Sequence, residues 1–549
     1  MQGHPHRGTI GTMISRAAKI AFLALVLLPP AAGATGYKIE TIALSGQAAP
    51  GIDPPAGFRG FLFATINANG DIAFSGSFGQ GTYRDGYWAF RNGVLQKVIV
   101  DGEPVGASGT KAEVRGDVLL NTAADVIAWM RTDATAPALE SFSEFFPSAI
   151  LAGQPPQLAA VAVAGGPPPL GDEGAIDFLD LMPLMSGSGF FTFLSGTWHA
   201  SDSFTTDLWR GRLDGTVTDL LLVERLTLEG PAGEPDCCVA FPAGIDATGR
   251  VYASGTRRDA ASGDRLAGMW LYDTAGQVQP IAFDGQAVPG SPGLSFKNPF
   301  DKLSHNDAGD IVFSTELSGA GVNAANDLAL WYRPQGAGEP VPLAREGDPT
   351  PDGGSYGKLP SPNSFDFAAA VIDAAGTVAF CADDDIWYGR PGSLSALARG
   401  GDPAPGMQDA FAGVYDDDSF GDCGVFLNGA GDAAFVGQVG AAFDSSNSVG
   451  LWVGKPGALS LVTGTGRSIA VRPSDWRTVQ QVFVGSWSTI GQPSGGQDGR
   501  GTILNDAGQV VFVARFTDGS RGVFRATPTT TPPEAAALSP IINYLVNGD

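Results

Sequence analysis

The chain has 549 residues, of which 77 are Gly and 39 are Pro, and only 16% are charged. This composition excludes a disordered protein, because 43% of the residues are hydrophobic and aromatic residues occur along the whole chain. The formal net charge of −24 excludes a surface suited to nucleic acid phosphates or to anionic lipid headgroups.

The N-terminus has the features of a secretory signal peptide over residues 1–34. Arg16 and Lys19 supply the positive charge, residues 20–28 form an unbroken apolar run, and residues 32–34 match the small-x-small cleavage pattern. The run is too short to span a bilayer, and no later segment reaches about 18 apolar residues. We therefore expect a secreted or periplasmic protein, free or associated with the cell surface, without an integral membrane segment after cleavage.

Within the remaining chain, the pattern Asn-x-x-Gly-x-x-Ala-Phe recurs. Five copies are clear, with Asp in place of the first Asn in one of them and Val in place of Ala in two, and they span residues 67–74, 306–313, 373–380, 428–435 and 505–512. Three more are degraded: 121–129 with one residue inserted, 189–193 with only the second half, and 246–253 with only the turn. Recurrence of this kind indicates a repeat architecture.

The pattern predicts a tight turn followed by a buried strand. Asn or Asp at the first position accepts hydrogen bonds from the backbone two residues on, and the Gly supplies a positive φ angle. The strand that follows is apolar on both faces, as expected of a sheet covered on both sides. Alternation places Ile72 and Phe74 on one face and Ala73 on the other.

Each period contains four predicted strands. In the first period they span 58–66, 71–78, 86–91 and 94–100, the third carries an aromatic residue such as Trp88, and a Gly/Pro crossing such as 102–104 follows. Four antiparallel strands repeated radially make the blade of a β-propeller. We therefore expect an all-β fold, a single propeller of eight four-stranded blades over residues 35–527.

The two ends of this region predict how the ring closes. The last blade, ending near residues 522–525, lacks a fourth strand, and residues 37–44 form a strand without a blade. If residues 37–44 complete the last blade, two exposed sheet edges disappear. The alternatives are an open row of β units and a ring of seven blades. Residues 528–549 are predicted to form a linker rich in Thr, Pro and Ala and a short tail.

The repeated pattern resembles that of the choice-of-anchor tandem-repeat NxxGxxAF-containing proteins of bacteria. The resemblance covers about residues 67–512. It implies an exported, surface-displayed protein of unassigned function, and it brings no catalytic residues with it. The chain departs from that family at its C-terminus, where 528–549 contain neither an apolar helix of membrane length nor a terminal basic cluster.

Two of the four cysteines are expected to form a disulfide. Cys381 follows the motif strand of the sixth predicted blade, and Cys423 lies just before the motif of the seventh. Because neighbouring blades face each other, the two thiols are predicted to meet. Cys237 and Cys238 are adjacent, so they could form only a strained bridge. The alternative is four buried thiols.

The chain offers little catalytic chemistry. His199 and His305 lie in different repeats without metal-type partners, and no nucleophile elbow or nucleotide-binding motif occurs, so we expect no catalytic residue and no cofactor-binding residue. The acidic loop with Asp416, Asp417, Asp418 and Asp422 is the candidate calcium site, and a second acidic run spans 383–385. A solvated loop is the alternative for both.

Trp476 and Trp487 lie in residues 466–500, which we expect to be the longest insertion between strands. We expect both side chains to pack in the core, and the alternative is that they are exposed on this loop and stack on sugars.

These features predict a monomeric binding or structural module that recognises an extracellular protein or a glycan through loops at one end of the ring. The alternative is a carboxylate-dependent hydrolase or lyase acting on a polysaccharide. That activity needs two or three acids converging at the mouth of the central channel.

Overall fold

The computed structural model describes residues 36–529, except for residues 80, 106–108, 124, 134–147, 171–173, 180–182, 199–203, 214–223, 227–239, 259–264, 300–302, 337, 360–369, 384, 414–423, 441–447 and 486–494. Residues Tyr37–Pro528 form one compact unit. The remaining unit consists of Met1–Gly36 and Thr529–Asp549, of which only Gly36 and Thr529 are described.

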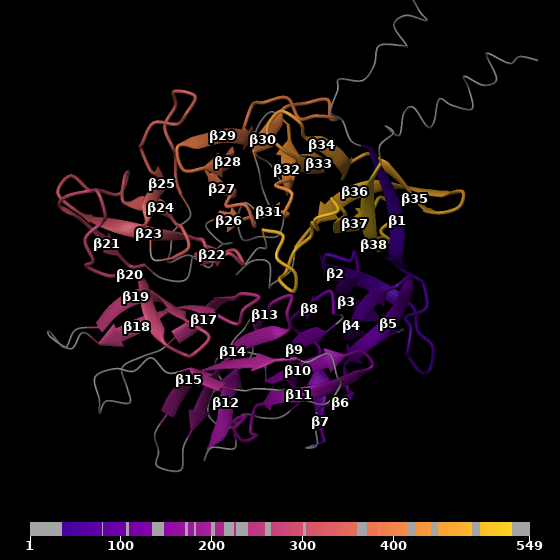
Figure 1. Cartoon of the computed structure of the whole chain (residues 1–549). Coiled ribbons are helices and arrows are strands. Elements are labelled where there is room, and N and C mark those ends of the chain that lie inside the picture. The colour runs from indigo at the N-terminus through magenta and orange to yellow at the C-terminus, as the bar shows by residue number, and fades with distance from the viewer. Residues whose placement is uncertain are drawn as a thin grey trace, which may run out of the picture. The chain divides into compact units, whose positions relative to one another are not determined.

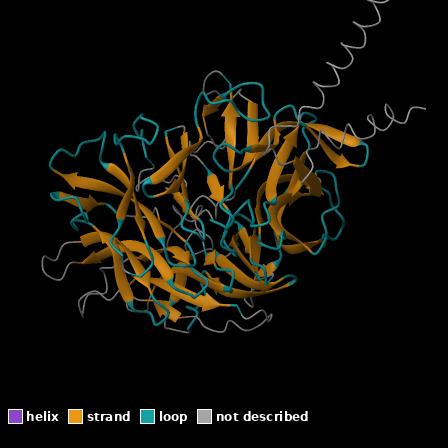
Figure 2. Cartoon of the chain, turned by 45° about the horizontal axis from the view of Figure 1, so that its top comes forward, coloured by secondary structure: helices purple, strands orange, loops and turns teal. Residues whose placement is uncertain are grey.

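All described regular structure is β-strand, arranged in eight antiparallel sheets around a ring (Figures 1 and 2). Blade 1 contains β2 (Phe58–Ile66), β3 (Ile72–Phe78), β4 (Arg84–Arg91) and β5 (Val94–Val100). Blade 2 contains β6 (Pro104–Val105), β7 (Thr110–Glu113), β8 (Val118–Leu120), β9 (Val126–Thr132), β10 (Ala149–Gln154) and β11 (Gln157–Val163). Blade 3 contains β12 (Ala175–Leu179), β13 (Leu184–Met185), β14 (Phe190–Trp198), β15 (Phe204–Arg212) and β16 (Glu224–Leu226). Blade 4 contains β17 (Ala240–Ile245), β18 (Val251–Arg258), β19 (Arg265–Tyr272) and β20 (Val278–Phe283).

The second half of the ring continues in chain order. Blade 5 contains β21 (Leu294–Lys297), β22 (Leu303–His305), β23 (Ile311–Gly319), β24 (Leu328–Arg333) and β25 (Val341–Arg345). Blade 6 contains β26 (Ala370–Ile372), β27 (Val378–Ala382), β28 (Asp385–Arg390) and β29 (Ser393–Ala398). Blade 7 contains β30 (Phe411–Gly413), β31 (Val425–Leu427), β32 (Ala433–Val439), β33 (Ser448–Gly454) and β34 (Ser460–Gly464). Blade 8 contains β35 (Ser468–Arg472), β36 (Asp475–Phe483), β37 (Val510–Phe516), β38 (Arg521–Thr529) and, from the start of the chain, β1 (Gly36–Leu44).

The ring closes as the sequence predicted, because β1 completes the last blade. Its sheet has the order β1-β38-β37-β36-β35, and the indigo β1 lies beside the yellow β38 in Figure 1. The Ser45 backbone N–H donates to the Arg521 carbonyl at 2.9 Å, and Arg525 pairs with Glu40 at 2.6 Å. The pairing covers an edge of β38 that would otherwise be free to pair with another chain.

The blades are held together by apolar layers between neighbouring sheets. Ile72 and Phe74 belong to the layer shared with blade 8, whereas Ala73 belongs to the layer shared with blade 2. The predicted alternation is therefore confirmed. The Phe of the motif stacks on the aromatic residue directly opposite on the third strand, as for Phe74 and Trp88, whose ring centroids are 6.2 Å apart.

The motif Asn shapes a turn and also joins neighbouring blades. Asn67 Oδ1 accepts the N–H of Asp71 at 2.8 Å, and Gly70 has a φ angle of 82°. Asn67 Nδ2 donates to the Asn121 carbonyl of blade 2 at 2.8 Å. The bond from Asn505 to the Asn67 carbonyl, at 3.1 Å, joins blade 8 to blade 1. Equivalent bonds run from Asn306 to the Asp373 carbonyl and from Asn428 to the Asn505 carbonyl.

Blade 2 contradicts the predicted insertion in its copy of the motif. The N–H of Asn121 donates to the Asp125 carbonyl, four residues on, as in the regular copies. No residue is inserted, because Ala128 takes the Phe position and faces blade 1, while Trp129 faces blade 3. In blade 3, Ser186 holds the position of the missing Asn, since its N–H donates to the Phe190 carbonyl.

The ring has two ends with different roles. The motif turns lie at one end, which we call the turn face. The opposite end, the crossing face, carries the blade-to-blade crossings and the turns between second and third strands. Seven described crossings share one geometry: a Gly N–H donates to a backbone carbonyl of the next blade, as Gly46 does to the Phe58 carbonyl at 2.8 Å. These glycines have positive φ angles, which explains why Gly recurs there.

Candidate binding surface at the closure of the ring

Most of the predicted calcium and disulfide residues lie outside the described part of the chain, namely Asp416, Asp417, Asp418, Asp422 and Cys423. The calcium site therefore stays a prediction. Cys381 is described and is disulfide-bonded. Since the other three cysteines fall in the gaps, its pairing with Cys423 also stays a prediction. Among the described residues, no group of three or more His, Cys, Asp or Glu could hold a metal ion.

Of the second acidic run, Asp383 and Asp385 are described, and both stabilise loops. Asp383 Oδ1 accepts the N–H of Lys358 at 2.8 Å, and Asp383 has a φ angle of 48°. Asp385 Oδ1 accepts the N–H of Gly400 at 3.1 Å.

The ring axis is occupied by a segment of the chain itself, residues 495–504, hereafter the axial segment. It is drawn in yellow near the middle of the ring in Figure 1. Gly495 bridges Leu427 of blade 7, and Gln497 Nε2 donates to the Ile372 carbonyl of blade 6 at 3.1 Å. At its other end, Thr502 exchanges hydrogen bonds with Thr65 of blade 1 at 3.0 and 3.1 Å.

Glycines let this segment approach the inner ends of the blades. A Cβ atom on Gly495 would lie 1.7 Å from the Ile372 carbonyl oxygen, and one on Gly499 would lie 2.5 Å from the backbone of Ser186 in blade 3. Asp498 accepts the N–H and the hydroxyl of Thr122 in blade 2 at 2.8 and 2.7 Å. The segment therefore contacts blades on every side of the axis.

Arg500 of the axial segment forms a buried pair with His305. Arg500 Nη2 lies 2.9 Å from His305 Nδ1, and Arg500 also donates to the backbone carbonyls of His305 and Ile245. The His305 ring stacks on Tyr252 with centroids 3.8 Å apart. Burial, and then the charge of Arg500, lower the pKa of His305 well below its usual value, so this imidazole is neutral. His305 Nε2 is buried without a hydrogen-bond partner.

Carboxylates near the channel at the turn face hold the motif turns. Asp71, Asp125 and Asp310 each accept a hydrogen bond from the Asn amide four residues earlier. These three carboxylates therefore act as hydrogen-bond acceptors within their own motif turns.

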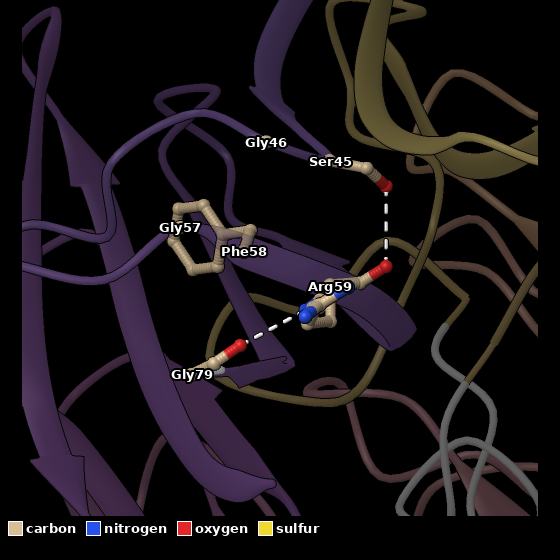
Figure 3. Close-up of a pocket in the computed structure, with 6 residues that line it drawn as sticks. All are labelled: Ser45, Gly46, Gly57, Phe58, Arg59 and Gly79. Carbon is tan, nitrogen blue, oxygen red and sulfur yellow. Dashed lines mark hydrogen bonds between the residues drawn. The ribbon is translucent and has the colours of Figure 1, made fainter. Parts of the chain in front are cut away.

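A pocket of about 480 Å³ lies on the crossing face where the ring closes (Figure 3). It is lined by Ser45, Gly46, Gly57, Phe58, Arg59 and Gly79. The Ser45 hydroxyl lies 2.9 Å from the Arg521 carbonyl and 3.3 Å from the Arg59 carbonyl. One side chain therefore contacts the start of blade 1 and the end of blade 8.

Three arginines, Arg59, Arg515 and Arg521, lie around this junction, and we call them the arginine strip. Arg515 and Arg521 are directly opposite each other on β37 and β38. Arg59 Nε donates to the Gly79 carbonyl at 2.9 Å, and Arg521 Nη1 donates to the Phe61 carbonyl at 3.4 Å. Among the described residues, no carboxylate forms an ion pair with any of the three, which is unusual in a chain with 57 acidic and 33 basic residues.

One exposed aromatic residue lies on β36, the strand paired with β37, and another lies beside Arg59. Trp476 is 66% exposed near the tip of the β35–β36 hairpin, and Tyr83 is 64% exposed beside Arg59, whose guanidinium lies 5.8 Å from the ring centroid. Core packing is therefore wrong for Trp476. The irregular insertion predicted at 466–500 is also wrong over β35 and β36, because the crossing into blade 8 is extended into this hairpin. Trp487 lies outside the described residues.

The last blade carries an unusual charge for this protein. Residues 465–529 hold seven Arg and four Asp, while the whole chain has a net charge of −24. Sequence reasoning missed this surface because it treated charge as a property of the whole chain.

The eight sheets and their closure define a β-propeller. The chain belongs to a family of unknown function, DUF7453, whose model matches residues 77–537. No curated protein has a sequence significantly similar to it. The resemblance to the NxxGxxAF proteins stays a prediction.

Several solved structures are similar at low sequence identity. The β-propeller domain of the Trilobed protease from Pyrococcus furiosus is 9% identical, with 74% of this chain and 95% of that chain covered and a TM-score of 0.36. The polysaccharide lyase Uly1 is 11% identical, with 78% and 92% covered and a TM-score of 0.34. The α-L-arabinofuranosidase Arb93A from Fusarium graminearum is 10% identical, with 77% and 97% covered and a TM-score of 0.30. At these values the likenesses carry nothing about the activity of this chain.

Proposed function

We propose that this protein is an exported β-propeller that acts as a binding module at or outside the cell surface, and that it binds through the crossing face of the ring. The observation that supports this most is the axial segment. Gln497, Arg500 and Thr502 are buried among the inner ends of the blades, so the chain itself occupies the axis. A ligand must then use the rim, and the rim has a pocket at the closure.

One further observation supports a role in binding. The axial segment and the cross-blade Asn bonds make a rigid scaffold, on which exposed side chains keep their positions without a ligand. Among the described residues, no helix has the length and apolar character needed to cross a membrane. A protein or glycan partner, export and a monomeric state remain parts of the proposal.

The alternative, a carboxylate-dependent polysaccharide hydrolase or lyase, has less support among the described residues. It requires acids converging at the mouth of the channel, where Asp71, Asp125 and Asp310 are bonded to motif amides.

The test is a glycan array incubated with the purified protein, followed by an assay of each bound glycan for new reducing or unsaturated ends. We expect retention on a defined group of glycans without release of fragments. Fragment release that requires the folded protein would contradict a binding role, and no retention on any glycan or extracellular protein would contradict the proposal altogether.

A further inference from the structure

We infer that the arginine strip, together with Trp476 and Tyr83, binds an acidic polysaccharide whose carboxylates pair with the arginines. This inference rests on the proposed function and specifies its ligand.

The facing pair Arg515 and Arg521 indicates a missing negative charge. Residues directly opposite on antiparallel strands have Cβ atoms about 5 Å apart, and like charges at that position destabilise the sheet. Arg521 relieves part of the cost through the Phe61 carbonyl and through Phe483, whose ring centroid lies 5.6 Å away. No described acid neutralises the pair, so a carboxylate from a ligand would be the natural counter-charge.

Arg59 extends the positive surface across the closure into blade 1. Its Nε is used by the Gly79 carbonyl, and no described acceptor bonds its two Nη atoms. Since Ser45 bonds to the backbones of both Arg59 and Arg521, these two arginines flank one junction. The guanidinium forks are suited to planar carboxylates, which can accept two hydrogen bonds at once.

The exposed aromatic side chains favour a sugar polymer over a small anion. Trp476 belongs to β36, where Gln481 lies opposite Arg515, and Tyr83 stands beside Arg59. Exposed rings on the neighbouring strand and beside Arg59 suit a chain in which apolar sugar faces alternate with carboxylates. Leu62, which is 58% exposed on β2, adds apolar surface next to Phe61, whose carbonyl bonds Arg521.

The negative net charge of the protein favours a ligand with a low charge per unit length. At physiological salt, charges farther than about 8 Å from the strip are largely screened, so a local positive surface attracts an acidic polymer despite the net charge of −24. A nucleic acid duplex carries more charge per unit length, so more of its charge would lie within the screening length of the acidic residues around the strip.

The experiment measures binding of the purified protein to polygalacturonate by calorimetry. Fully methyl-esterified polygalacturonate has the same sugar without the charge, and polyglutamate has the charge on a peptide. The test variant is Arg515→Gln with Arg521→Gln. The matched control is Arg345→Gln with Arg390→Gln, which removes the same charge from blades 5 and 6, where both arginines also bond backbone carbonyls.

We expect polygalacturonate to bind, the esterified polymer not to bind, and binding to weaken as salt rises. The test variant should lose roughly tenfold in affinity for each arginine, and the control should lose little. The melting temperature of the test variant should equal or exceed that of the wild type, because a repulsive pair is removed. If the two arginines had only a structural role, their replacement would lower the melting temperature. Arg59→Gln, at an exposed residue, provides a second variant should the double variant fail to fold.

The inference is overturned if polygalacturonate does not bind, if both arginine pairs affect binding equally, or if polyglutamate binds as tightly, which would identify an acidic peptide site. Retention of other glycans with unchanged affinity in the test variant would overturn the inference while leaving the proposed function intact.

Discussion

Asn505 closes the ring of cross-blade hydrogen bonds, and its replacement by Ala is predicted to destabilise the whole propeller. Its side chain is 3% exposed and makes four hydrogen bonds. Nδ2 donates to the Asn67 carbonyl at 3.1 Å and to Gln509 at 2.9 Å, while Oδ1 accepts the N–H groups of Ala507 and Gln509 at 3.1 and 3.0 Å.

The size of the effect follows from the groups left without partners. Asn505→Ala removes the acceptor of the N–H groups of Ala507 and Gln509 and leaves the Asn67 carbonyl with only the N–H of Gly70, while the half-buried side chain of Gln509 can turn to water. At about 1 kcal/mol for each lost bond, the free energy of unfolding should fall by about 3 kcal/mol. Asn505→Asp keeps the accepting oxygen, as Asp246 and Asp373 do in blades 4 and 6, so it should cost about 1 kcal/mol.

The assay is equilibrium unfolding in urea of the wild type and both variants, with Asn306→Ala as the matched control. Asn306 makes the same bond between blades 5 and 6, which the chain already links covalently. A loss below about 1 kcal/mol for Asn505→Ala, or an equal loss for Asn505→Asp, would refute the reasoning.

Four other predictions follow from single contacts. Burial lowers the pKa of His305, so this imidazole stays neutral in the folded protein, whereas in the unfolded chain it takes up a proton near the usual histidine pKa of about 6.5. The free energy of unfolding should therefore fall below about pH 6.5, by up to about 1.4 kcal/mol per pH unit. Urea titrations of the wild type and of His305→Gln should show a smaller loss in the variant. Gly499→Ala should lower the free energy of unfolding by about 1–3 kcal/mol, measured by thermal or urea unfolding, and by more than Gly457→Ala does. Both glycines have φ angles near 80°, but only Gly499 has backbone atoms within 4 Å of the added Cβ. Trp476→Ala should change the unfolding free energy by less than about 0.5 kcal/mol while weakening polygalacturonate binding, and a large loss of stability would contradict its exposed position. Peptide mapping by mass spectrometry without reduction should find Cys381 joined to Cys423, and a link to Cys237 or Cys238 would contradict the predicted pairing.

The repeat predicted the architecture because its residues answer local physical demands. Asn67 and Gly70 suit a tight turn, and the apolar strand after them must be covered on both faces, so the four strands of blade 1 and the closing strand could be placed from sequence. The degraded copies were harder. In blade 2 the large residue moved from the position of Phe74 to that of Trp129, on the opposite face, which looked like an insertion.

The candidate surface could not be predicted in the same way. Arg515 and Arg521 are six residues apart and become neighbours only through a hairpin register, while Arg59 joins them only because β1 closes the ring. The axial segment contains glycines and polar residues that resemble an exposed loop, and nothing local in its sequence shows that it is buried at the axis. These features depend on distant contacts, which composition and periodicity do not report.

Hydrogen–deuterium exchange with and without polygalacturonate tests the central claim most directly, namely that the axis is filled by the chain and that binding occurs at the closure of the ring. The amides of Gly495, Thr502 and Leu504 should exchange as slowly as those of β37 whether or not the polymer is present, because they are buried and hydrogen-bonded. Added protection should fall on β36, on the β37–β38 turn and on β2. Rapid exchange at Gly495, Thr502 and Leu504, or ligand protection there instead of at the arginine strip, would contradict the account.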